Sequence, residues 1–142
     1  MRAFYLAKFS TKYNLTEYVA ISNQPDVMEE AKAVKVDLLN QMVYIAVEIN
    51  KQKYFNMTVY QPGSPPGEDN ANVAILGYSW SFGVREWTTV IGNENFTDQF
   101  GRMDVSGNYL YVFLNSFSTA YSTNSSQTDI YFYKLRVFNG FI

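Results

Sequence analysis

The side chains that most enzymes use for nucleophilic and metal chemistry are missing from this sequence. Its 142 residues include no cysteine and no histidine. Thiolate nucleophiles, imidazole bases and ligands, disulfides and histidine triads are therefore excluded. The remaining carboxylates, lysines, tyrosines and serines form no glycine-rich phosphate loop, no G-x-S-x-G motif and no Ser-x-x-Lys motif. We expect a protein that is not an enzyme and that holds no cofactor.

One pair of carboxylates can be placed relative to each other from the sequence. Asp37 and Glu48 fall on the same face of an expected sheet, two rows apart, with Lys35 nearby. A glycosidase needs two carboxylates about 5–10 Å apart across a cleft. An open sheet face beside a lysine lacks the water-excluding setting that a general acid requires. We interpret this pair as surface charge and assign no catalytic residue.

Oxygen-rich side chains gather between residues 92 and 104, where a calcium site has to be considered. The candidate ligands are Asn93, Glu94, Asn95, Asp98 and Asp104. Hard oxygen atoms of this kind suit Ca²⁺, but the spacing does not match that of an EF-hand loop. We expect a surface connection here and assign no metal site.

Tyrosine and tryptophan side chains are the best candidates for a binding surface. Strand alternation places Asp37, Tyr44 and Tyr60 in one row on the outer face of the expected sheet. Two tyrosines beside a carboxylate form a flat amphipathic patch that can stack a sugar ring or anchor a protein. Such pairs also simply stabilise sheets, and another segment can cover the face. Trp80 and Trp87 are candidates for the same binding role or for the core.

The charge balance limits the classes of partner. Eleven basic and 13 acidic residues give a formal net charge of −2, without a block of lysines and arginines. A nucleic-acid-binding surface normally carries a basic stripe, so we expect no nucleic acid partner. No segment approaches the ~20 apolar residues that cross a bilayer, so we expect no membrane partner. A protein partner, copies of the chain itself or a glycan suits an 18% aromatic composition better.

The strands that position these residues are predicted from apolar side chains at every second position. Three such runs lie between residues 33 and 61, as expected for half-buried strands. A tight turn at Asn40 and Gln41 would pair Leu38 with Val43, and a short loop at 51–53 would lead into a third strand. We predict a three-stranded antiparallel meander whose inner face carries Val34, Val36, Leu38, Val43, Ile45, Val47, Ile49, Phe55, Met57 and Val59.

The rest of the chain adds strands and almost no helix. Further strands are predicted at residues 4–9, 17–21, 72–82, 84–91, 109–114 and 130–138. Residues 27–32 form either one helical turn, because Asp26 and Glu29 have capping-box spacing, or a polar loop. Eight to nine strands at this spacing indicate an all-β antiparallel sandwich in a single domain, 1–142. We favour a jelly-roll-like topology, with immunoglobulin-like and barrel topologies open, because the Cys–Trp–Cys spacing of immunoglobulin domains is absent.

Two of the predicted strands have no polar face. Residues 109–114 are apolar at both parities, and so is most of 130–137. A sandwich strand buries about half of its side chains, so these strands leave an apolar excess. We expect it to be buried in a homo-oligomer, a two-fold dimer in the simplest case, unless residues 118–128 or the N-terminal strand cover it.

The closing residues of the chain carry a resemblance to a known family. Leu135-Arg136-Val137-Phe138-Asn139 resembles the end of the last strand in laminin-G-like domains of the concanavalin type. The resemblance is confined to these residues and implies a β-sandwich.

We therefore expect a non-enzymatic structural or protein-interaction subunit, of the kind found in virions and surface assemblies. The alternative is a carbohydrate-binding module that uses surface tyrosines and tryptophans. Residues 1–7 are too short for a signal-peptide core, so the chain stays in the cell, has lost a signal, or leaves through assembly or lysis.

Overall fold

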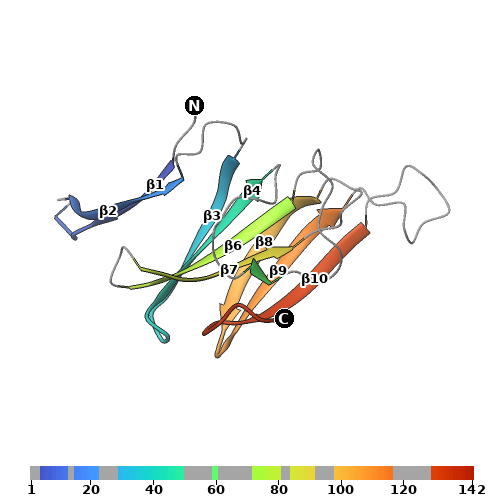
Figure 1. The fold of residues 1–142 in the computed structure, drawn as a ribbon. Coiled ribbons are helices and arrows are strands. Elements are labelled where there is room, and N and C mark those ends of the chain that lie inside the picture. The colour runs from blue at the N-terminus through green and yellow to red at the C-terminus, as the bar shows by residue number, and fades with distance from the viewer. Residues whose placement is uncertain are drawn as a thin grey trace.

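The protein is an all-β sandwich. The computed structural model describes residues 4–12, 15–22, 29–49, 59–60, 72–80, 84–91, 98–116 and 129–142. These residues form ten strands and no helix. Eight of the strands belong to two sheets that pack face to face, and the other two form an N-terminal hairpin (Figure 1). The prediction of an all-β antiparallel sandwich is confirmed.

The larger sheet has five strands in the order β3-β4-β6-β7-β5. Four long strands run antiparallel, and they are β3 (Glu29–Asp37), β4 (Met42–Ile49), β6 (Asn72–Ser79) and β7 (Arg85–Ile91). The short β5 (Val59–Tyr60) lies parallel to β7 at the far edge. The sequences of β4 and β6 are apolar at both parities, which suits strands in the middle of a sheet that is buried on both faces.

The smaller sheet has three antiparallel strands in the order β10-β9-β8. They are β8 (Asp98–Ser106), β9 (Tyr109–Ser116) and β10 (Asp129–Arg136), drawn from orange to red in Figure 1. A two-residue turn joins β8 to β9, and Gly107 adopts a φ of +57° at its first position. Glycine at this position is typical of a type II′ hairpin turn.

The main hydrophobic core fills the space between the two sheets. The five-stranded sheet and the three-stranded sheet both contribute a face to it, as a sandwich requires. Its buried side chains are Met42, Tyr44, Ala46, Val73, Ile75, Trp87, Ile91, Met103, Leu110, Val112, Leu114, Leu135 and Val137.

A second cluster of buried apolar side chains lies on the outer face of the five-stranded sheet. Its members come from β4, β6 and β7, and they are Val43, Ile45, Val47, Ile49, Ala74, Leu76, Tyr78 and Val90. The hairpin of β1 (Phe4–Phe9) and β2 (Leu15–Ser22) reaches this cluster through Leu6. The five-stranded sheet is therefore buried on both faces at β4, β6 and β7.

The predicted meander is correct in its first hairpin and wrong in its register and its third strand. β3 and β4 do pair, but Val36 lies opposite Val43 rather than Ile45, because the turn holds four residues instead of two. The register thus differs by two residues, which keeps the same side chains together on each face. The second neighbour of β4 is β6, and Val59 lies in β5 at the opposite edge. Phe55 and Met57 fall outside the described residues.

Other predictions about the strands differ in detail. β3 begins at Glu29, so residues 29–32 form strand instead of a helical turn. Residues 98–104, predicted to belong to a connection, lie in β8, which extends to Ser106. Strands in both sheets mostly neighbour the strands next to them in sequence, and the jelly-roll-like topology stays a prediction.

Candidate functional site

The predicted binding residues Tyr44 and Asp37 do not lie on an exposed face. Tyr44 is fully buried and Asp37 is buried at the end of β3. Their face of the five-stranded sheet was predicted to be the outer one, but it packs against the three-stranded sheet. That prediction was wrong because strand alternation separates two faces without saying which one is covered when both are apolar.

Asp37 and Tyr44 instead hold two turns together. The Asp37 carboxylate accepts hydrogen bonds from the backbone and side-chain amides of Asn40, at 3.0 and 2.8 Å, and from the Tyr44 hydroxyl at 3.1 Å. The side-chain amide of Asn40 also donates to the carbonyl of Gly107, 2.8 Å away in the β8–β9 turn. Burial, together with the nearby Asp37, raises the pKa of Tyr44. These contacts stabilise the corner of the sandwich and leave no surface for a ligand.

The tryptophans have different environments. Trp87 is buried, and its indole N–H donates to the carbonyl of Val137 at 2.8 Å, so it takes the core role. Trp80 is 37% exposed, and the Lys8 ammonium lies 5.7 Å from its ring centroid. Tyr60 lies in β5, and pairing through Thr89 and Ile75 puts it in the row of Ala46 instead of that of Tyr44. The structure thus brings Asp37, Tyr44 and Trp87 together, but inside the sandwich, where the Tyr44 and Trp87 ring centroids lie 5.9 Å apart. Trp80 and Tyr60 are not part of this group.

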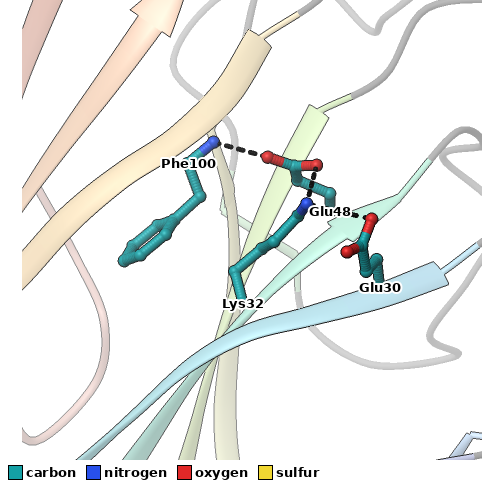
Figure 2. A network of polar contacts seen from close by, with 4 residues as sticks. All are labelled: Glu30, Lys32, Glu48 and Phe100. Carbon is teal, nitrogen blue, oxygen red and sulfur yellow. Dashed lines mark hydrogen bonds and ion pairs between the residues drawn. The ribbon is translucent and has the colours of Figure 1, made fainter.

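The carboxylate Glu48 belongs to a network that joins strands (Figure 2). One of its oxygens accepts a hydrogen bond from the backbone amide of Phe100 at 2.8 Å, which links β4 to β8. Lys32 lies 3.1 Å from the other Glu48 oxygen and 2.9 Å from Glu30. Hydrogen bonds to both carboxylates raise the pKa of Lys32. An ammonium held between two carboxylates is an ion-pair network, and Asp37 takes no part in it.

The candidate calcium ligands are not gathered at one point. Asp98 is buried at the start of β8, whereas Asp104 is exposed near the end of the same strand. Asp104 lies 2.6 Å from the ammonium of Lys35, whose hydrogen bond lowers the pKa of that carboxyl. Within the described residues no three acidic side chains group as metal ligands would. Residues 93–95 lie outside the described part.

The most distinctive surface is the outer face of the three-stranded sheet. Strand alternation and pairing place three rows across it, which we call the aromatic face: Arg102, Phe113 and Phe132; Asp104, Tyr111 and Lys134; and Ser106, Tyr109 and Arg136. Ile130 continues the face at one end, 73% exposed, and Phe132 is 54% exposed. The inner faces of the same strands fill the main core with Leu110, Val112, Leu114 and Leu135.

The rings of the aromatic face pack against one another. Phe132 stacks with Tyr111, with ring centroids 5.7 Å apart, and makes a tilted contact with Phe113 at 5.0 Å. The Lys134 ammonium lies 3.8 Å from the centroid of the Tyr109 ring. The result is an apolar ridge across β9 and β10, with cationic side chains beside it.

The sequence carried a signal for this surface, although the residues first singled out lie elsewhere. That signal was the apolar character of residues 109–114 and 130–137 at both parities. A strand buried on one side must then expose the other set. What the sequence did not reveal is β8, which brings Arg102 and Asp104 onto the same face.

A scan against models of protein families and a search of curated proteins both ended without a match. Among the described residues there is also no helix with the length and apolar character that a membrane span needs.

Proposed function

We propose that this chain is a non-enzymatic structural and interaction subunit that associates with copies of itself through the aromatic face. The observation that carries the proposal is the exposure of large apolar side chains on β9 and β10, strands whose other side is already committed to the core. Contiguous apolar surface of this kind on a soluble domain marks an interaction site.

The chemistry of the aromatic face supports a macromolecular partner. Tyrosine, phenylalanine and arginine are enriched in the centres of protein interfaces, and the face combines Tyr109, Phe113 and Phe132 with Arg102 and Arg136. The rings already contact one another, so little side-chain freedom is lost when a partner covers them.

One of the two rival covers for this face is placed elsewhere. The N-terminal strand β1 packs through Leu6 against the second cluster, which belongs to the other sheet. The segment 118–128, the second rival, lies outside the described residues. A subunit that associates in this way suits an assembly of many copies, as in a virion or a surface appendage.

Light scattering behind a sizing column tests the proposal at several micromolar concentrations. The parent chain is expected to run as more than one copy, with a mass that rises with concentration. Phe132→Glu places a charge in the centre of the aromatic face and is expected to give the mass of a single chain. The matched control is Phe9→Ser, which removes an equally exposed ring from β1.

Circular dichroism and a melting curve show whether each variant is folded. A parent chain that is a single copy at every concentration contradicts self-association. A Phe132→Glu variant that is folded and still as large as the parent shows that another surface is responsible.

A carbohydrate-binding role on the same face is the second candidate. Gln99 and Asn115 lie opposite each other where the aromatic rows end, so amide groups adjoin exposed rings. Sugar recognition uses such a combination of stacking and hydrogen bonding. This role would be favoured over self-association if the protein is a single copy and added sugar protects its aromatic face. The protection should be lost in Phe132→Glu.

A further inference from the structure

A second exposed apolar surface lies on the opposite side of the molecule. On the outer face of the five-stranded sheet, Val34 and Val36 of β3 are exposed, and Leu38 and Leu39 in the following turn are 76% and 79% exposed. We call these four residues the β3 strip. Val34 lies opposite Ile45 and Val36 opposite Val43, so the strip continues the second cluster to the edge of the sheet.

The two apolar surfaces face in opposite directions. The aromatic face is the outer side of one layer of the sandwich, and the β3 strip is on the outer side of the other layer (Figure 1). A copy that uses one surface therefore leaves the other free for a further copy. Contacts between two different surfaces are heterologous, and they build rings or open chains instead of a closed two-fold pair.

The distribution of charge also separates the two surfaces. The aromatic face carries Arg102, Lys134 and Arg136 against Asp104, a formal charge of +2. The whole chain carries −2, so the rest of the molecule carries −4. Two aromatic faces brought together would place like charges in one interface, which disfavours a pair of aromatic faces.

The cations of β3 add no like charge to the β3 strip. Lys32 is held by Glu30 and Glu48, and Lys35 by Asp104. Strand alternation and these ion pairs place both lysines on the face of β3 away from Val34 and Val36. The β3 strip therefore presents aliphatic side chains without a like charge, which suits a ridge of rings flanked by cations.

From these observations we infer that copies of this chain associate head to tail, with the aromatic face of one copy seated on the β3 strip of the next. The inference rests on the proposed function, because it names which surface of the second copy the aromatic face binds.

Two variants with one damaged surface each provide the test. Phe132→Glu damages the aromatic face, and Leu38→Glu damages the β3 strip at a site exposed enough to accept a charge. Each variant alone is expected to be a single copy in light scattering. An equimolar mixture is expected to form a pair and to grow no further, because one intact aromatic face and one intact strip remain.

The possible outcomes distinguish a failure of the head-to-tail arrangement from a failure of self-association through the aromatic face. If Phe132→Glu is a single copy while Leu38→Glu is as large as the parent, self-association stands and the head-to-tail arrangement is wrong. A mixture that stays single-copy likewise overturns the inference. If neither variant differs from a multi-copy parent, both the inference and the aromatic-face proposal fail. Ile130→Glu and Leu39→Glu replace either variant that does not fold.

Discussion

On the outer face of the five-stranded sheet, β4, β6 and β7 keep their apolar side chains buried, whereas β9 and β10 leave theirs exposed on the outer face of the three-stranded sheet. Both sheets contain strands that are apolar at both parities, β4 and β6 in one and β9 in the other. The difference therefore does not come from the composition of the strands. An apolar outer face is therefore covered within the molecule in one sheet and remains exposed in the other.

The largest expected effect tests this difference directly. Ile45→Ala removes a side chain from the second cluster and is expected to lower the free energy of unfolding by about 2–5 kcal/mol, through lost burial and a cavity. Phe132→Ala on the aromatic face is expected to cost about 1 kcal/mol, mainly through ring contacts. Urea unfolding measures both losses, provided that the two substitutions are compared in a protein that is a single copy in solution. Equal losses would show that the two outer faces do not differ.

Two glycines with left-handed backbone compare a crowded position, where the C-terminal residues pack on β7, with an open one in the β8–β9 turn. Gly140 has a φ of +69°, and a Cβ there would lie 2.5 Å from the Trp87 ring and closer still to the Thr89 hydroxyl. Gly140→Ala is expected to cost about 2–4 kcal/mol, from overpacking together with the left-handed conformation.

Gly107→Ala is the matched control in the three-stranded sheet. Its φ is +57° but nothing lies within 4 Å of a Cβ, so only the conformational cost of about 1–2 kcal/mol is expected. Urea midpoints that rank the two variants in the opposite order would contradict the packing of the C-terminal residues on β7.

The dependence of stability on pH probes the two faces of the five-stranded sheet together. Burial raises the pKa of Tyr44 on the inner face and of Tyr78 on the outer face. An unfolded tyrosine titrates near pH 10. Stability is therefore complete below about pH 10 and falls as the pH rises above it, because the unfolded chain loses its protons first.

Urea unfolding between about pH 8 and 11 measures this loss, and Tyr44→Phe is expected to make it less steep. A slope unchanged by Tyr44→Phe would mean that this phenol does not resist ionisation in the folded protein. Lys32, whose pKa is also raised, loses its stabilising charge over the same alkaline range and accounts for part of the remaining slope.

The smallest effect is expected at the edge of the three-stranded sheet. Asp104→Asn removes an exposed ion pair with Lys35, and such pairs contribute little because water and salt screen them. The urea midpoint is expected to stay within experimental error of the parent. A clear loss of stability would show that Lys35 and Asp104 close the edge between β3 and β8.

Strand alternation allowed the sheets to be predicted more fully than their faces. The runs that became β1, β4, β7 and β9 were predicted within a few residues, because burial imposes a period of two on each strand. Tyr44 was assigned to the wrong side because every residue of β4 except Glu48 is buried, so the pattern contains no reference for inside and outside.

The remaining errors come from turns and from competition between strands. Asp37 and Asn40 close a four-residue turn by hydrogen bonds that the sequence pattern did not show, and this shifts the register by two. β6 takes the place beside β4, since its Val73 to Leu76 run is apolar at both parities and suits a central strand. β8 was overlooked because the oxygen-rich residues before it resemble a loop, although Met103 and Val105 alternate with Arg102 and Asp104.

The polar links between the two layers have a consequence for the time course of folding. Asn40 with Gly107, Glu48 with Phe100 and Trp87 with Val137 each join residues at least 50 positions apart. The hairpins within each layer can form from neighbouring segments, but these links require long loops to close first. We therefore expect the docking of the layers to be the slow step of folding, on the millisecond-to-second scale of β-sandwiches. Until that step is complete, the apolar sides of both layers are open to neighbouring chains.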